Sequence, residues 1–224
     1  VEASGTLKAS NASSMGSSST IESRSTGIHS QERNLFIDVT GTTGAEFRHR
    51  KVDDEVLPMG GGVVVFDYNG DGRDDIYVTN SFGPNALLKN TGEGGFVDVA
   101  EAAGVADASG RANGGCAADY NNDGARDLYV TNYGDSKLFR NNGDGTFTNA
   151  TTKLSEAASE QALSIGWSTS AALVDYDRDD DLDLYVVGYV QHDTSRACYG
   201  DNSLQDYCNP QVFEPTSDRL YQNN

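Results

Sequence analysis

The sequence predicts an all-β protein, and three observations lead to this prediction. An acidic nine-residue loop occurs three times, starting at Asp67, Asp119 and Asp175. The residues on both sides of each loop are rich in β-branched and aromatic types, which favour strands. Helical periodicity is nearly absent outside short segments at 100–104 and 155–163. We therefore expect short strands that are joined by acidic turns.

Each loop carries oxygen-bearing side chains at positions 1, 3, 5 and 9. A cation such as Ca²⁺ takes about six to eight oxygen ligands, which alternate residues of a tight loop can supply, with position 7 offering its backbone carbonyl. At position 6, Gly72 and Gly124 permit the positive φ of a sharp turn, and Asp180 tolerates it. The sequence thus predicts three Ca²⁺ sites, formed by Asp67, Asn69, Asp71, Arg73 and Asp75; by Asp119, Asn121, Asp123, Ala125 and Asp127; and by Asp175, Asp177, Asp179, Asp181 and Asp183.

An EF-hand begins with a similar pattern, but it needs a bidentate Glu at position 12 and a helix on each side. Position 12 is a valine in all three loops, namely Val78, Val130 and Val186, and the flanks read as strands. Plain hairpin turns are the other alternative for any single copy. Three copies in equivalent contexts favour metal binding.

The loops belong to a longer repeat, and each repeat supplies four short strands. The first aspartates of successive loops lie 52 and 56 residues apart, a spacing typical of β-propeller blades with four antiparallel strands. We expect about three blades, at 60–104, 112–154 and 166–224. The third lacks a fourth strand, whereas segment 35–40 resembles one, because Phe36-Ile-Asp-Val matches Phe96-Val-Asp-Val.

The loop pattern, the Leu-Tyr-Val strand after it and the Asn-Asn-Gly-Asp-Gly-Thr-Phe stretch at 141–147 resemble FG-GAP or VCBS repeats of integrin α-chain propellers. The similarity is closer still to the family of proteins that resemble cartilage acidic protein, in which a Cys-containing insertion precedes a strand like 218–221. It covers roughly residues 35–224. The resemblance implies a calcium-braced extracellular propeller, seven-bladed or similar, that serves adhesion or scaffolding.

Three blades do not readily close a ring, since propellers commonly hold about four to eight. Two explanations remain open. The chain is a fragment of a longer protein, or Phe36–Thr40 of one subunit adds to the open edge of blade three in the next. Such a head-to-tail contact, together with the N-terminal arm, would produce a homo-oligomer or a filament.

Composition indicates an extracellular or cell-surface protein. The net charge of −18 repels nucleic acid and anionic lipid, and no apolar run is long enough to span a bilayer. Residues 1–34 are rich in Ser and Thr, and we interpret them as a linker or leader, or as an O-glycosylated arm along a neighbouring subunit. Asn11 and Asn149 begin N-glycosylation acceptor patterns.

The cysteines and histidines show no catalytic pattern, so we expect a protein that is not an enzyme. Cys198 and Cys208 lie in a polar insertion, where a disulfide would close a small loop, and Cys116 is expected to be a small buried hydrophobe. The main functional prediction is a calcium-stabilised structural or adhesion module. The alternative is a propeller that binds or cleaves carbohydrate with its blade-top loops, including the 188–217 insertion. The ligand would then be a protein or a glycan.

Overall fold

The structure is a computed structural model that describes residues 36–49, 61–156, 166–193, 195–199, 205–206 and 208–224. The chain divides into two compact units, Val1–Ile37 and Asp38–Asn224, and the second contains every helix and strand named below. The predicted N-terminal arm at 1–34 lies outside the described residues. None of the helices in the described ranges is long and apolar enough to cross a membrane.

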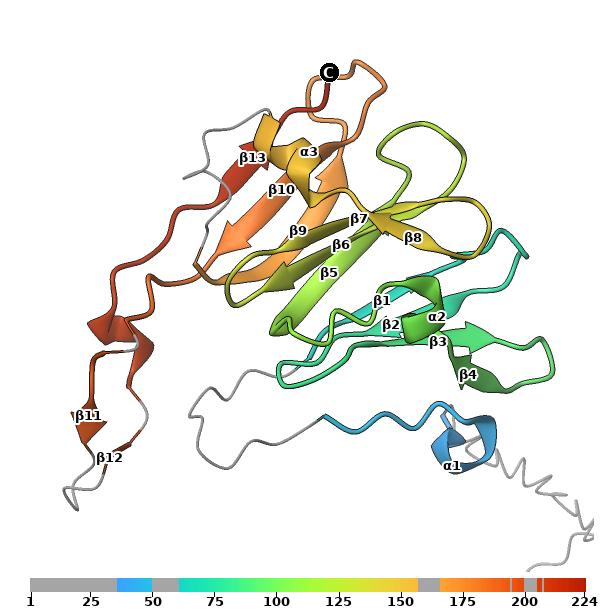
Figure 1. The fold of residues 1–224 in the computed structure, drawn as a ribbon, viewed down its shortest axis with the longest axis horizontal. Helices are drawn as coiled ribbons and strands as arrows, with labels where there is room; N and C mark the ends of the chain where they lie inside the picture. The colour runs from blue at the N-terminus through green and yellow to red at the C-terminus, as the bar shows by residue number, and fades with distance from the viewer. Residues whose placement is uncertain (1–35, 50–60, 157–165, 194, 200–204, 207) are drawn as a thin grey trace, which may run out of the picture. The chain divides into compact units, whose positions relative to one another are not determined.

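Three antiparallel sheets confirm the all-β prediction and the blade architecture (Figure 1). Blade 1 has the order β1-β2-β3-β4, blade 2 has the order β5-β6-β7-β8, and blade 3 has the order β9-β10-β13. Their bounds are β1 Val63–Phe66, β2 Asp75–Val78, β3 Ala86–Asn90 and β4 Phe96–Asp98; β5 Ala112–Ala118, β6 Asp127–Asn132, β7 Lys137–Asn141 and β8 Phe147–Asn149; and β9 Ser168–Val174, β10 Asp183–Gly188 and β13 Arg219–Tyr221.

Short helices follow the fourth strands. Helix α2 spans Ala100–Ala103, as the sequence predicted, and α3 spans Thr151–Glu156; the rest of the helical segment expected at 155–163 lies outside the described residues. Helix α1 spans Thr40–Thr43. The strand predicted at 35–40 is not formed in its described part, because residues 36–39 lie in no strand and Thr40 begins the helix.

The first strands of the blades lie side by side in the order β1, β5, β9, because glycine lets their backbones approach. A Cβ atom on Gly62 would lie 2.7 Å from the Cα atom of Gly114. A Cβ atom on Gly114 would lie 2.8 Å from the carbonyl oxygen of Thr169. Blade 2 therefore lies between blades 1 and 3.

A hydrophobic core fills the space between neighbouring blades, because alternate residues of each strand point to one face. In β1, Val64 and Phe66 are buried, whereas Val63 and Val65 are exposed. The core between blades 1 and 2 includes Phe66, Tyr68, Tyr77 and Leu87 of blade 1, Ala100, Ala103 and Val105 after it, and Leu128, Phe139 and Phe147 of blade 2. A smaller cluster joins blades 2 and 3, with Tyr129, Leu138, Leu184 and Val186 at its centre.

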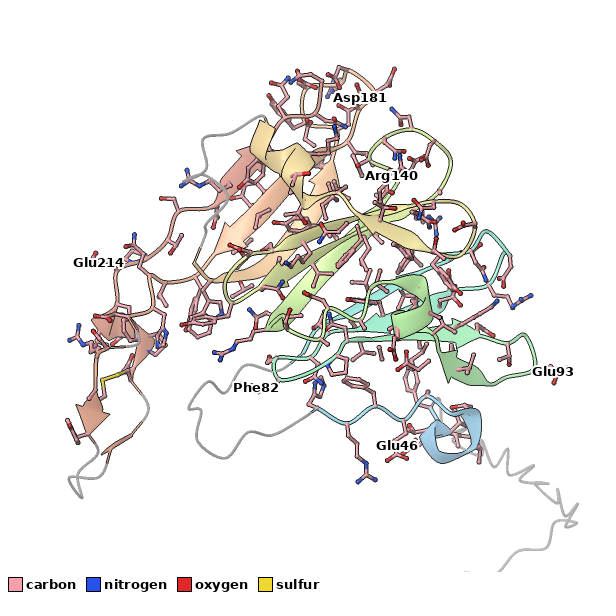
Figure 2. The ribbon with its side chains drawn as sticks, in the orientation of Figure 1. Glu46, Phe82, Glu93, Arg140, Asp181 and Glu214 are labelled. Atoms are coloured by element: carbon pink, nitrogen blue, oxygen red, sulfur yellow. A yellow bond between two sulfur atoms is a disulfide. The ribbon has the colours of Figure 1, made fainter. Side chains whose placement is uncertain are left out.

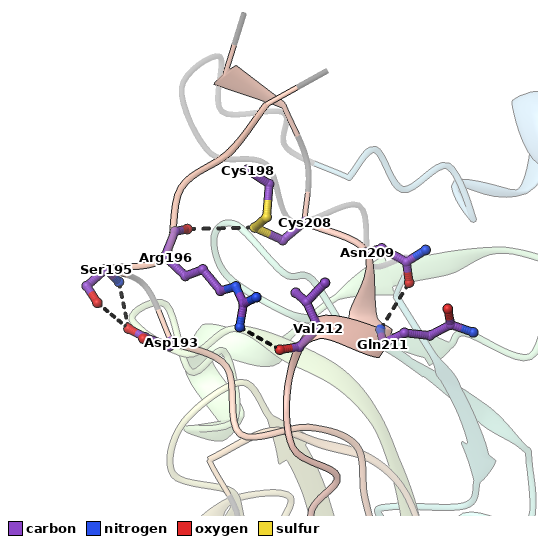
Figure 3. Close-up of a disulfide and its surroundings, with 8 residues drawn as sticks. All are labelled: Asp193, Ser195, Arg196, Cys198, Cys208, Asn209, Gln211 and Val212. Atoms are coloured by element: carbon purple, nitrogen blue, oxygen red, sulfur yellow. Dashed lines mark hydrogen bonds between the residues drawn. A yellow bond between two sulfur atoms is a disulfide. The ribbon is translucent and has the colours of Figure 1, made fainter. Parts of the chain in front are cut away.

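Blade 3 has three strands among the described residues, and a long connection separates the last two. It carries the two-stranded hairpin of β11 (Cys198–Tyr199) and β12 (Gln205–Asp206), followed by the 3-10 helix η1 (Pro210–Val212). A disulfide joins Cys198 to Cys208, with Cα atoms 5.2 Å apart, which confirms the predicted bridge (Figure 3). The Arg196 guanidinium donates to the carbonyl oxygen of Val212 at 2.8 Å and fixes the base of this hairpin.

Candidate metal centre

The three acidic loops join the first two strands of each blade and follow one rim of the sheets (Figure 1). Loop 1 is 67–75, loop 2 is 119–127 and loop 3 is 175–183. The Asn122 side chain in loop 2 donates to the carboxylate of Asp181 in loop 3 at 2.6 Å, and Figure 2 labels Asp181 on this rim. Loops 2 and 3 therefore contact one another.

The carboxylate at position 1 organises each loop by accepting backbone N–H groups. In loop 1, Asp67 Oδ1 accepts from Gly70 at 2.8 Å, and Oδ2 accepts from Gly72 at 2.7 Å. Asp119 accepts the N–H groups of positions 5 and 6 in loop 2, and Asp175 accepts those of positions 4 and 5 in loop 3. The backbone of each loop is thus wrapped around the carboxylate at position 1 by hydrogen bonds within the loop.

This wrapping requires a positive φ at positions 4 and 6 of every loop. Loop 1 supplies glycine at both positions, whereas loop 3 places Arg178 at φ 66° and Asp180 at φ 71°. The expectation that Asp180 adopts a positive φ is confirmed. Loop 3 carries more backbone strain than the others, because side chains at positive φ cost about 1 kcal/mol each.

The aspartate at position 9 ties each loop to the third strand of its own blade. Asp127 is fully buried, its Oδ1 accepts the N–H of Asn141 at 2.7 Å, and its Oδ2 accepts the N–H of Tyr120 at 3.2 Å. Asp75 and Asp183 repeat both bonds. A carboxylate oxygen with one hydrogen bond keeps a lone pair, so these bonds leave position 9 able to bind a cation.

Loop 3 brings three carboxylates together. One oxygen each from Asp175, Asp177 and Asp183 lie within 4.8 Å of one another, and in the described ranges this is the one group of three or more acidic, His or Cys side chains that does so. Asp179 and Asp181, also predicted as ligands, lie in the same loop outside this group. Asp179 accepts from the N–H of Asp181, and Asp181 faces Asn122.

Loops 1 and 2 have asparagine at position 3, which leaves fewer carboxylates to gather. In loop 1 the Arg73 guanidinium binds Asp71 at 2.6 Å, so a cationic side chain occupies that carboxylate. In both loops the asparagine oxygen instead accepts the N–H of position 5, as Asn121 does from Asp123 at 3.0 Å. Metal binding by the position 7 backbone carbonyls, those of Arg73, Ala125 and Asp181, stays a prediction.

Burial, with repulsion from neighbouring carboxylates, raises the pKa values of Asp75, Asp127 and Asp177. Burial raises the pKa of Asp127 to about 6, with Asp123 and Asp119 adding to the shift. The pKa of Asp75 is raised mainly by burial, and that of Asp177 by burial and then by Asp179 and Asp183. Oxygen donors that repel one another fit a divalent cation, which favours their ionised form.

The sequence matches a known repeat at the loops themselves. Residues 67–130 and 119–186 match the FG-GAP-like repeat, which together is more than half of the chain. The chain belongs to the FG-GAP-like repeat family. Each match starts at position 1 of one loop and ends at the valine at position 12 of the next, so the family pattern includes pairs of neighbouring loops.

Relatives with this similarity are cartilage acidic protein 1 from three animals. The human protein is 31% identical over 165 residues, which is 70% of this chain and 24% of the relative. The Xenopus tropicalis protein is 30% identical over 127 residues, covering 56% of this chain and 19% of the relative. The mouse protein is 40% identical over 74 residues, covering 33% and 12%. The chain thus spans up to about a quarter of the length of these relatives, and the resemblance seen in the sequence is confirmed.

Other predicted site residues fall around the FG-GAP blades. Asn149 ends β8 with an exposed side chain that accepts the N–H of Thr151 at 3.0 Å, and its glycosylation stays a prediction; Asn11 lies outside the described residues. Cys116 is a half-buried free cysteine in β5, and burial raises the pKa of its thiol to about 12. It packs against the core between blades 2 and 3, as expected for a small hydrophobe.

The sequence interpretation missed the role of an asparagine at the end of each third strand. The Asn141 side chain donates to the carbonyl oxygens of Tyr68 and Arg126 at 2.7 and 2.9 Å. Asn223 donates to the carbonyl oxygen of Tyr120 at 2.7 Å. These bonds tie blade 2 to loop 1 and blade 3 to loop 2. Their signal was present in the repeat, because the aligned segments all end in asparagine.

Proposed function

We propose that this chain is a calcium-stabilised structural or adhesion module of an extracellular protein. The observation that carries the proposal is the group of three carboxylates in loop 3, held within 4.8 Å on a loop that spaces oxygen donors at alternate positions. Ca²⁺ bound there would neutralise carboxylates that otherwise repel one another. In loop 3, Asp175, Asp177 and Asp183 would hold it.

The residues around the loops explain why such an ion would stabilise the blades. The position 9 aspartate begins the second strand of its blade, and its carboxylate contacts both the loop and the third strand. Fixing this carboxylate therefore fixes the loop and the two strands together. A ligand that binds only the folded state raises its stability by mass action. The fold therefore uses the loops as braces, with no step of covalent chemistry.

An extracellular location is supported by three features. The disulfide between Cys198 and Cys208 is typical of an oxidising compartment. Extracellular calcium reaches concentrations that fill even weak sites. Three bound ions would change the net charge from −18 to −12, so the surface would stay acidic and repel anionic polymers.

A calcium titration tests this proposal. We expect heat of binding for up to three ions, and thermal unfolding that shifts to a lower temperature when a chelator is added. The variant Asp177→Asn should lose the loop 3 site, whereas Glu93→Gln removes an equal charge from an exposed hairpin outside the loops and should bind as the parent does. An unfolding temperature that is the same with calcium and with chelator would contradict the proposal.

Glycan binding is the second candidate, and one pocket favours it. Gln191, His192, Asp193 and residues 215–217 line a polar pocket in the insertion of blade 3. The hydroxyl of Thr216 is buried there and has no hydrogen-bond partner among the residues that the structure describes. The aromatic residues nearby pack edge to face on one another, and Trp167 is only 2% exposed, so they offer no open stacking surface. Binding of the monomer to a glycan array, lost in Thr216→Val, would support this function.

A further inference from the structure

Loops 1 and 2 carry the same residues at the predicted side-chain ligand positions. Positions 1, 3, 5 and 9 are Asp, Asn, Asp and Asp in both loops, and position 6 is glycine in both. The aspartate at position 9 is fully buried in each loop and accepts the same two backbone N–H groups. The set of side-chain donors therefore gives the two loops no reason to differ in calcium affinity.

The two loops differ at positions 4, 7 and 8. Position 7 is Arg73 in loop 1 and Ala125 in loop 2. The Arg73 guanidinium donates to Oδ2 of Asp71, the carboxylate at position 5, at 2.6 Å. In the part of the chain that the structure describes, no other side chain at these three positions binds a carboxylate of its own loop. Position 7 is thus the difference that affects a predicted ligand.

The oxygen that Arg73 binds is the one nearest to the ligand at position 3. Asp71 Oδ2 also accepts the side-chain amide of Asn69 at 3.1 Å, whereas Oδ1 accepts the backbone N–H of Arg73 at 3.0 Å. Both oxygens of this carboxylate are therefore engaged. In loop 2, Asp123 Oδ1 accepts the N–H of Ala125 at 3.0 Å, and within the described ranges Oδ2 accepts no hydrogen bond.

A second contact places the guanidinium against the turn between β3 and β4. Arg73 Nε donates to the carbonyl oxygen of Asn90 at 3.4 Å, and a Cβ atom on Gly92 would lie 3.4 Å from the same nitrogen. Figure 2 labels Glu93 in this turn. The Arg73 side chain keeps 42% of its surface exposed, so it can leave Asp71 for solvent while the blade stays folded.

The equivalent space in blade 2 is open. By the register of the third and fourth strands, Gly143 is the counterpart of Gly92. A Cβ atom on Gly143 would meet nothing within 4 Å. Ala125 and Gly143 line a pocket of about 420 Å³, together with residues 67–70 of loop 1. An arginine at position 7 of loop 2 would therefore have room to lie as Arg73 does in blade 1.

We propose that the Arg73 guanidinium is a tethered competitor of calcium in loop 1, so that loop 1 binds the ion more weakly than loop 2 and fills after it. The inference rests on the proposed structural function and describes how one of its sites is regulated. An ion that binds Asp71 has to displace the guanidinium. Because the backbone carbonyl of Arg73 is itself a predicted ligand, the displaced charge stays close to the ion.

Displacement and repulsion both weaken binding in loop 1. The Arg73–Asp71 pair is partly exposed, so breaking it costs little. Repulsion between the guanidinium and a doubly charged ion is larger, because the Coulomb energy grows with the product of the charges. Together they predict a dissociation constant about tenfold higher for loop 1 than for loop 2. Blade 1 would then be braced at a higher calcium concentration than blade 2.

The amide signals of two glycines can report the two loops separately. The N–H groups of Gly72 and Gly124, at position 6, each donate to the position 1 carboxylate of their loop at 2.7 Å. Calcium that binds this carboxylate changes the surroundings of the amide. A calcium titration of the isotope-labelled 224-residue chain, followed by NMR, therefore gives one dissociation constant for each loop. We expect the Gly124 signal to change at about tenfold lower calcium than the Gly72 signal.

Removing the guanidinium tests the competition directly. Arg73→Ala should lower the dissociation constant of loop 1 about tenfold and leave that of loop 2 unchanged. Arg48→Ala is the matched control, because it removes the same charge and an ion pair of the same length, 2.6 Å to Glu46, from outside the acidic loops. It should titrate as the parent does. If loop 1 of Arg73→Ala binds calcium as weakly as in the parent, or more weakly, the proposal is overturned, since a guanidinium that only orients Asp71 would give that result.

The reverse substitution transfers the competitor to loop 2. In Ala125→Arg we expect the dissociation constant of loop 2 to rise about tenfold, while that of loop 1 stays at the parent value. Thermal unfolding in chelator shows whether each variant is folded before calcium is added. An unchanged affinity of loop 2 in a folded Ala125→Arg chain would contradict the proposal.

The same titrations separate this inference from the proposed function. If both glycine signals respond to calcium at one concentration, in the parent and in Arg73→Ala alike, the competition is refuted and calcium stabilisation stands. If calcium changes neither the glycine signals nor the unfolding temperature, the proposed function fails as well.

Discussion

The side chain of Asn141 donates a hydrogen bond to the carbonyl oxygen of Tyr68 at 2.7 Å, across the boundary between blades 2 and 1. Asn141 is 2% exposed, and its own N–H is held by the Asp127 carboxylate. One residue therefore joins the acidic loop of its own blade to the loop of the blade before it.

Replacing Asn141 by alanine should destabilise the protein by about 2 to 4 kcal/mol, because the buried carbonyl of Tyr68 and the partly buried carbonyl of Arg126 would lose their partner. Chemical denaturation measures this change. The neighbouring Asn142→Ala is the control, since that side chain is exposed and its bonds can be replaced by water. Equal effects for the two variants would show that the bonds across the boundary carry little stability.

The adjacent acids of loop 1 make a second matched pair. Asp75 is fully buried and accepts the N–H groups of Tyr68 and Asn90, whereas Asp74 is exposed. We expect Asp75→Ala to cost about 2 to 5 kcal/mol, because it leaves the buried N–H of Tyr68 and the partly buried N–H of Asn90 without an acceptor, and Asp74→Ala to cost less than about 0.5 kcal/mol. Unfolding in the presence of chelator measures both without any contribution from metal.

The raised pKa of Asp127 predicts how stability depends on pH. Its folded value of about 6 lies above the unfolded value of about 4, so the folded chain holds a proton that the unfolded chain releases. Without metal, the free energy of unfolding contributed by this group should fall as pH rises from about 4 to about 6.

Calcium affinity should change in the opposite direction, because the ion binds the ionised carboxylate. Titrations should therefore show tighter binding at pH 7 than at pH 5, with release of a proton. The variant Asp127→Asn should flatten the pH dependence of the metal-free chain. A parent chain whose stability in chelator changes between pH 4 and 6 just as that of Asp127→Asn does would contradict this prediction.

Relieving the backbone of loop 3 should stabilise it. Asp180 at φ 71° occupies a region that glycine enters without strain, and Asp180 lies outside the carboxylate group of this loop. We expect Asp180→Gly to raise the unfolding free energy by up to about 1 kcal/mol. The reverse change at the equivalent position, Gly124→Ala, should destabilise loop 2 by a similar amount. Loss of stability in Asp180→Gly would show that its side chain matters more than its φ.

Much of the blade architecture follows from the sequence. The strands on either side of each loop were predicted because β-branched runs and repeated aspartates fix both their type and their pairing. Position 6 of loop 3 was predicted from the conformational range of aspartate alone. The Cys198–Cys208 bridge was predicted because the two cysteines lie ten residues apart in a polar insertion, where a disulfide closes a small loop.

Other features depend on tertiary packing. The segment at 35–40 has the sequence of a fourth strand, yet residues 36–39 form no strand, because a strand needs a neighbour that sequence pattern does not supply. The gathering of Asp177 with Asp175 and Asp183, while Asp179 stays outside, depends on side-chain directions within one turn.

Because of the asparagine at the end of the third strand, the junction between two blades depends little on the sequence of the preceding blade. Asn141 and Asn223 reach back to a main-chain oxygen, and a carbonyl is present whatever the residue type. A blade inserted, removed or exchanged during evolution or protein engineering keeps this junction if it brings its own asparagine. A further blade can therefore follow an existing one without a change in the sequence of the existing blade.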